Sequence, residues 1–128
     1  MKELTLNEYQ KRAMTTCLPS CENLSYMLLN LVGEVGEFSS KVAKAIRKGD
    51  LYIEKNKLCV SDSFAPYFLD WFEELKKEAG DMLWQLSGVC SVLGWPLNDV
   101  GNGNLDKLSA RKEVGTIIGN GDGIIREK

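Results

Sequence analysis

The stretch LVGEVGEFSSKVAKAIRKGD, residues 31–50, combines an apolar helical face with two acidic residues beside it. Apolar residues recur every three or four positions and basic residues precede Gly49-Asp50, so we expect a helix from about Asn23 to Lys48. On a helical wheel with Glu34 at zero, the apolar side chains centre near about +70° and Glu37 falls at about −60°. Both carboxylates therefore border the face that is expected to be buried. A carboxylate is costly there unless a positive charge lies against it.

A second segment, residues 66–93, repeats this arrangement. On a wheel with Glu78 at zero, its apolar residues again centre near about +70° and Asp81 falls at about −60°. Packing the two apolar faces together brings the four carboxylates to one edge of the interface, where a divalent cation or protonation relieves their repulsion. The alternative is two solvated acidic faces, with Lys41 and Lys44 paired to the acids of their own helix.

The sequence contains no histidine, which excludes several classes of catalytic and metal site. It excludes a Ser-His-Asp triad, a histidine general base, a histidine-ligated metal and the Glu-x-x-His motif of a di-iron bundle. A metal would have to be a hard cation on oxygen ligands, namely magnesium, manganese or calcium. Cys17 and Cys21 have the spacing of half a zinc site, but Cys59 and Cys90 are isolated, so we interpret the cysteines as buried or free thiols.

Composition favours one soluble domain spanning residues 1–128, with 16 basic and 18 acidic residues and a net charge of −2. This balance argues against a nucleic-acid partner bound through charge alone. No apolar run approaches the ~18 residues of a membrane span, and the first residues lack the apolar core of a signal peptide. We therefore expect no membrane partner and a cytoplasmic location.

Two further helices complete the expected fold. The capping-box sequence TLNE, residues 5–8, predicts a helix from about Leu6 to Thr16. Another is expected from about Leu97 to Lys112, where each of two glycines costs about 1 kcal/mol relative to alanine. Residues 51–66 fit either a strand pair or a loop, and the glycine-rich tail lacks helical period. The prediction is an all-α, four-helix-type bundle with an irregular insertion between the second and third helices.

Three blocks of the sequence resemble a known family. They are EVGEFSSKVAKAIRKGD, EELKKEAGDMLWQL and NLDKLSARKEVGTIIGNGD, and they resemble the MazG-like nucleotide pyrophosphohydrolases of the all-α NTP pyrophosphatase superfamily. The signature is E-x-x-E followed by E-x-x-D, and the third block makes it more specific. The resemblance covers most of the chain. It implies magnesium-dependent hydrolysis of nucleoside triphosphates to monophosphate and pyrophosphate, with Mn²⁺ as a substitute metal and nucleotide-pool cleaning as the role.

The resemblance also implies roles for individual residues. The metal ligands carried over by position are Glu34, Glu37, Glu78 and Asp81. One carboxylate is expected to accept the proton of the attacking water, with Glu37 favoured and Glu34 as the alternative catalytic residue. The implied triphosphate contacts lie at i, i+3 and i+7 on one face of the fourth helix, at Asn104, Lys107 and Arg111. Lys41 is a further phosphate candidate, and a solvated polar face is the alternative reading of the trio.

Other features point to assembly or to a different function. Residues 51–75 are rich in aromatics and fit a lid, a base-stacking element or an oligomer contact, and we place Trp84 or Trp95 at a subunit interface. We expect a homodimer or homotetramer. The tail offers Asp122 and Arg126 as contacts to substrate or to a neighbouring subunit. The rival function is a non-catalytic helical interaction or regulatory module with solvated acidic faces.

Overall fold

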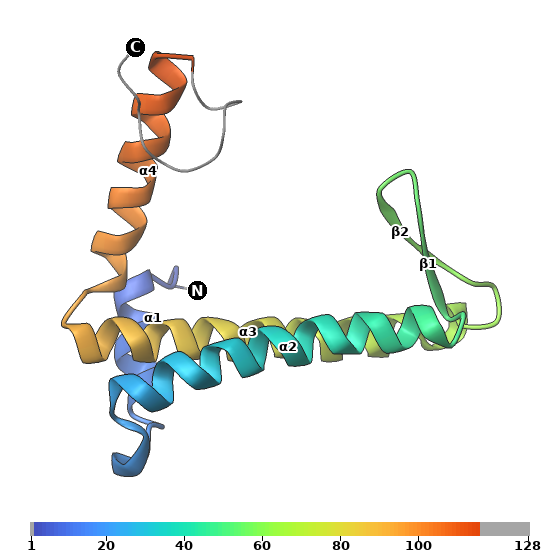
Figure 1. The fold of residues 1–128 in the computed structure, drawn as a ribbon, viewed down its shortest axis with the longest axis horizontal. Coiled ribbons are helices and arrows are strands. Elements are labelled where there is room, and N and C mark those ends of the chain that lie inside the picture. The colour runs from blue at the N-terminus through green and yellow to red at the C-terminus, as the bar shows by residue number, and fades with distance from the viewer. Residues whose placement is uncertain (1, 116–128) are drawn as a thin grey trace.

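The computed structural model describes residues 2–115 of the chain, and within them the predicted all-α class is confirmed. The helices are α1 (Leu6–Met14), α2 (Leu24–Arg47), α3 (Phe68–Leu93) and α4 (Leu97–Glu113), with short 3₁₀ turns at Pro19–Cys21 and Ala65–Tyr67. The strands β1 (Leu51–Glu54) and β2 (Lys57–Val60) form an antiparallel hairpin between α2 and α3. In Figure 1, α2 and α3 lie side by side, α1 and α4 gather at one end of the pair, and the hairpin stands at the other.

Local sequence signals set the helix ends. The side chain of Thr5 accepts a hydrogen bond from the Glu8 amide at 3.0 Å, and that of Asn23 caps α2 through the Tyr26 amide at 2.8 Å. Gly49 and Gly94 follow α2 and α3 with φ of 77°, a left-handed conformation that glycine adopts without the strain of a Cβ. The predicted boundaries therefore agree with the structure to within a few residues.

The insertion adopts the strand pair, the first of the two structures that the sequence left open. Leu51 pairs with Val60 and Glu54 with Lys57. The two-residue turn between the strands places Lys55 and Asn56 at φ of 50° and 61°, as the tight hairpin turns require. Leu51 is only 1% exposed, so it anchors the hairpin against the helices.

The core lies along the α2–α3 interface. Gly88 sits so close to Met27 that a Cβ added there would lie 2.3 Å from the Met27 sulfur, which makes a glycine necessary for this approach. Leu75 and Val89 are also buried along α3, yet Leu28, at 46%, stays largely exposed. Other members of the predicted apolar faces that are about 40% exposed are Val35, Ile46, Leu86 and Leu93. The described chain thus covers only part of the apolar surface of its central helix pair.

Trp84 packs against α1 within the chain, and its place at a subunit interface stays a prediction. Its indole nitrogen donates to the Ala13 carbonyl at 3.1 Å and to the Thr16 hydroxyl at 2.9 Å. These hydrogen bonds form because α1 lies against the side of α3, which the wheel of a single helix does not reveal. Trp95, by contrast, keeps 53% of its surface exposed.

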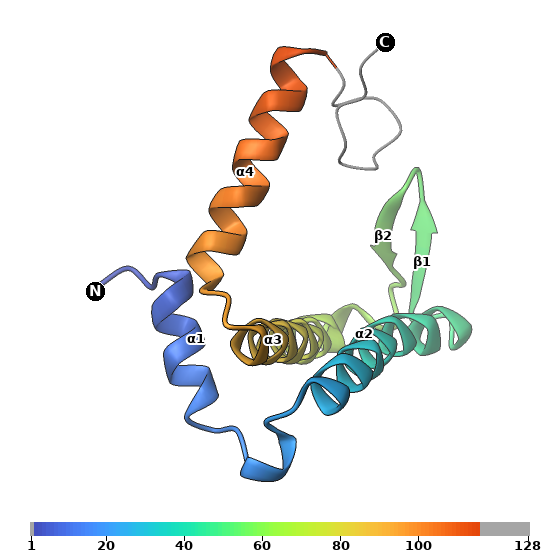
Figure 2. The ribbon, with the colours of Figure 1, turned by 60° about the vertical axis from the view of Figure 1, so that its left-hand side comes forward.

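Hydrogen bonds hold the first turn of α4 against α1. The Asn7 side chain accepts a hydrogen bond from the backbone N–H of Asn98 at 2.9 Å, and the Asn98 side chain accepts one from the backbone N–H of Asn7 at 3.1 Å. The Gln10 side chain accepts from the backbone N–H of Leu97 at 2.9 Å. Beyond this first turn, α4 rises away from the α2–α3 pair on the same side as the hairpin (Figure 2). None of the helices within residues 2–115 combines the length and the apolar character of a membrane span.

Candidate functional site

Three of the four predicted carboxylates come together between α2 and α3. Glu34, Glu78 and Asp81 each offer a carboxylate oxygen, and these oxygens lie within 4.8 Å of one another. Glu34 comes from the middle of α2, whereas Glu78 and Asp81 lie one turn apart on α3. An all-oxygen set of negative charge is the donor set that hard divalent cations prefer. We call these three residues the carboxylate cluster.

Glu37 stands beside the cluster rather than inside it. It lies on the next turn of α2, is exposed, and lines a cleft together with Glu78. Its helical offset from Glu34 turns it away from the helix interface and toward the cleft. The four acids therefore share one edge of the helix pair as predicted, but only three of them converge.

The surroundings of Glu34 disfavour its ionised form. Burial raises the pKa of its carboxyl, and the nearby charges of Glu37, Asp81 and Glu78 raise the pKa further, while a hydrogen bond from Asn30 opposes them. Its Oε2 atom is buried and has no hydrogen-bond partner within residues 2–115. An unpaired oxygen on a carboxylate that lies near other carboxylates is unfavourable unless a cation or a proton neutralises the group. The residues present thus fit a divalent cation.

A pair of carboxamides supports Glu34 from the core side. The Asn30 amide donates to Glu34 Oε1 at 3.4 Å and to Gln85 Oε1 at 2.7 Å, and the Gln85 amide in turn donates to the Met27 carbonyl at 3.4 Å. Neither residue was predicted from the sequence. A signal was nevertheless present, because Asn30 lies four residues before Glu34 and Gln85 four residues after Asp81, on the acidic stripes of their helices.

A cleft of about 620 Å³ adjoins the carboxylate cluster. Lys41 and Lys44 line it from the last turns of α2 and Lys48 from the residue after its end, and Phe64 and Trp71 line it near the start of α3. The two rings meet edge to face with centroids 6.3 Å apart. Lys41 was predicted for substrate contact, whereas the other two lysines were not. The cleft therefore offers positive charge and an aromatic wall next to the acids.

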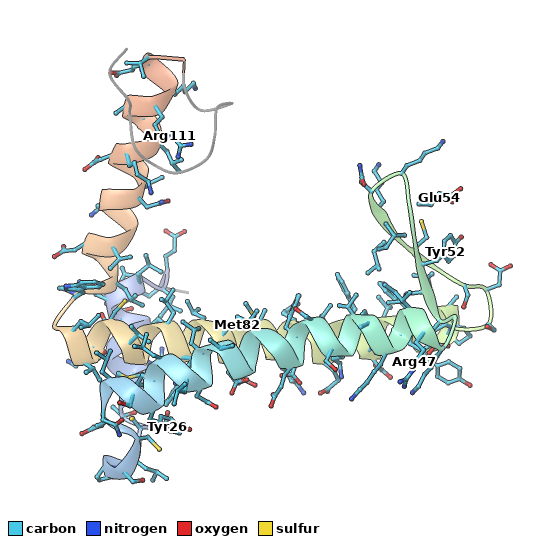
Figure 3. The ribbon with its side chains drawn as sticks, viewed as in Figure 1. Tyr26, Arg47, Tyr52, Glu54, Met82 and Arg111 are labelled. Carbon is cyan, nitrogen blue, oxygen red and sulfur yellow. The ribbon has the colours of Figure 1, made fainter. Side chains whose placement is uncertain are left out.

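The polar residues predicted on α4 lie apart from the carboxylate cluster within one chain. Asn104 and Lys107 are exposed, and Arg111 is 8% exposed. In Figure 3, Arg111 lies near the far end of α4, whereas Met82, one residue after Asp81, lies midway along the α2–α3 pair. The tail residues Asp122 and Arg126 fall outside the described part of the chain.

Comparison with known proteins agrees with this arrangement of acidic helices. Residues 22–115 match the family model of the MazG nucleotide pyrophosphohydrolase domain. "Gene 37 protein" of Mycobacterium phage L5 is 35% identical over 103 residues, which cover 80% of this chain and 78% of the phage protein. No solved structure gives a match. The matched region contains both carboxylate helices, the insertion and α4, but not α1.

Proposed function

The chain belongs to the MazG nucleotide pyrophosphohydrolase family, and we propose that it is a magnesium-dependent enzyme that hydrolyses nucleoside triphosphates to nucleoside monophosphate and pyrophosphate. The observation that carries the proposal is the convergence of three carboxylates at the edge of a lysine-lined cleft. A nucleotide combines a polyanionic chain with an aromatic base, and the two kinds of cleft wall suit these two parts. The corresponding role is the removal of surplus or non-standard triphosphates.

Glu34, Glu78 and Asp81 would hold Mg²⁺ or Mn²⁺, with Glu37 available from the neighbouring turn of α2. The bound cation would supply neutralising charge for the phosphate oxygens and polarise the bond that breaks. The buried Glu34 Oε2 supports this assignment, since no group in the described part of the chain donates a hydrogen bond to that atom.

Glu37 is the favoured general base. It is exposed at the cleft, so it can reach a water molecule next to a bound phosphate, whereas Glu34 has one oxygen held by Asn30 and the other buried. The three lysines of the cleft, Lys41, Lys44 and Lys48, attract the phosphate chain and stabilise the negative charge on the leaving pyrophosphate. Trp71 and Phe64 provide a surface on which the nucleoside packs.

We further propose a homodimer or homotetramer in which α4 of one copy lies over the carboxylate cluster of another. Leu29 and Val32 on α2 are 76% and 72% exposed, an apolar surface that a second copy would cover. The positive charge of Lys107 and Arg111 complements the acids, and assembly offers these residues and Asn104 a route to a triphosphate.

The first test is pyrophosphate release from a panel of ribo- and deoxynucleoside triphosphates, with Mg²⁺ and with EDTA. We expect magnesium-dependent pyrophosphate, and a loss on the order of 10²-fold or more in Glu37→Gln because the general base is removed. Release of orthophosphate instead would show that the terminal bond is cleaved. Absence of both hydrolysis and Mg²⁺ binding in calorimetry would favour the non-catalytic helical module.

A further inference from the structure

The Asn30 and Gln85 side chains form a directed chain of hydrogen bonds between the core and the carboxylate cluster. Gln85 is 1% exposed, and its amide nitrogen donates to the Met27 carbonyl at 3.4 Å and to the Met27 sulfur at 3.1 Å. This leaves Gln85 Oε1 to accept from Asn30 at 2.7 Å. Because both ends of the buried amide are engaged, its orientation is set by the core and not by solvent.

The orientation of Gln85 sets that of Asn30. Gln85 Oε1 can only accept, so the Asn30 NH₂ group must face it, and that group has a second hydrogen available. The second hydrogen points to Glu34 Oε1, 3.4 Å from the nitrogen. This series of hydrogen bonds therefore ends on Glu34 Oε1 and leaves Oε2 buried without a partner among the described residues.

This arrangement matters because the terminal torsion of a glutamate is soft. Glu37, Glu78 and Asp81 all repel the Glu34 carboxylate, so an unrestrained side chain would turn away from them. A hydrogen bond to Oε1 keeps the carboxylate in place against this repulsion.

We propose that Asn30 and Gln85 are positioning residues that hold Glu34 ready to bind a divalent cation through Oε2. The inference rests on the proposed function, in which Glu34 is a metal ligand. Groups that orient a ligand in this way are worth about 10–100-fold in metal affinity. A merely structural role, in which the amides only satisfy each other within the helix interface, predicts lower stability with unchanged affinity.

The test is Mg²⁺ titration by calorimetry of the full chain, at a temperature where every variant is folded by circular dichroism. We expect Asn30→Ala and Gln85→Met to weaken Mg²⁺ binding by about 10–100-fold. Ser87→Ala is the matched control, because Ser87 is equally buried on α3 but its hydroxyl donates only to the Leu83 carbonyl, at 2.9 Å. It should lose stability and keep its affinity.

A double-mutant cycle locates the effect. In a Glu34→Gln background, Asn30→Ala should change Mg²⁺ affinity by less than about twofold, because the group that it positions has gone. Wild-type affinity in Asn30→Ala, or an undiminished loss in the Glu34→Gln background, would overturn the inference and leave the proposed function standing. A wild-type protein that binds no Mg²⁺ would overturn both. Should Gln85→Met fail to fold, Asn30→Ala and the cycle carry the test.

Discussion

The acidic edge of the α2–α3 pair and the polar face of α4 are marked by the same kind of spacing, yet they end in different situations. Glu34, Glu78 and Asp81 converge within 4.8 Å because their helices pack along their length. Asn104 and Lys107 sit on a helix that is fastened to α1 at its first turn and then rises away (Figure 1). Periodicity assigns side chains to a face, but only packing decides what that face meets.

The largest expected effect comes from mixing two variant proteins, one defective in the acidic edge and the other in α4. Glu78→Gln removes a carboxylate of the cluster and Lys107→Ala removes a cation of α4, and each alone should lower kcat by about 10²–10³-fold. If α4 acts on the partner's site, half of randomly mixed dimers combine the two variants, and each of these has one intact site. Pyrophosphate release should then return to about a quarter of the wild-type rate.

Two matched controls accompany the mixing experiment. Glu73→Gln changes an exposed carboxylate on the same helix, paired with Lys76 at 2.9 Å, and should leave the rate nearly unchanged. Mixing Glu78→Gln with Asp81→Asn should give no recovery, since both changes damage the same face. No recovery in the first mixture would contradict the assignment of α4 to the site of another copy.

Replacing one glycine by alanine in α3 and another in α4 compares how closely the two helices are packed. Gly88→Ala would place a methyl group 2.3 Å from the Met27 sulfur and should lower the free energy of unfolding by about 1–3 kcal/mol. Gly103→Ala lies in α4 with nothing within 4 Å of the new methyl group, and should raise it by up to about 1 kcal/mol through helix propensity. Chemical denaturation measures both. A destabilising Gly103→Ala would show that α4 is closely packed in solution, for example against a second copy.

The pH dependence is the smallest expected effect. The pKa of Glu34 lies above its ordinary value of 4.5, chiefly because of burial. The folded state therefore binds more protons than the unfolded state in this range, so the metal-free protein should lose stability as the pH rises through the Glu34 pKa. At the proposed site Mg²⁺ would compete with those protons, so its effect on Tm should be larger at pH 8 than at pH 5.

Glu34→Gln provides the control for the pH experiment, because it removes the titrating group. Thermal melts of this variant should show a weaker change between pH 5 and pH 8, with and without Mg²⁺. An unchanged pH dependence would mean that other carboxylates dominate.

Much of the fold could be predicted from local signals. The cap at Thr5, the cap at Asn23 and the glycines at 49 and 94 mark helix ends through short-range hydrogen bonds and backbone geometry. The hairpin was harder to predict, because its Lys55-Asn56 turn contains no glycine. The contact of Trp84 with α1 was not predicted, because its position off the apolar stripe does not reveal that α1 lies against it.

The candidate site, like the fold, was predicted from the sequence only in part. The acidic residues were visible as repeated pairs in a chain without histidine. Asn30 and Gln85 were not, because a carboxamide on a helix is common and its value here depends on a partner 55 residues away in the sequence. The cleft was also hidden, since its lysines come from α2 and its aromatic residues from the other side of the insertion.

The amino-acid sequence by itself determined the helices, their apolar faces, the acidic edge and the family, because these depend on periodicity, capping and residue type within short segments. Only the tertiary structure decided which acids converge, which oxygen of Glu34 is held, where the cleft opens and that α4 departs from the helix pair. These depend on the distance between segments far apart in the chain. That distance is set by close contacts such as Gly88 against Met27, and no periodicity encodes it.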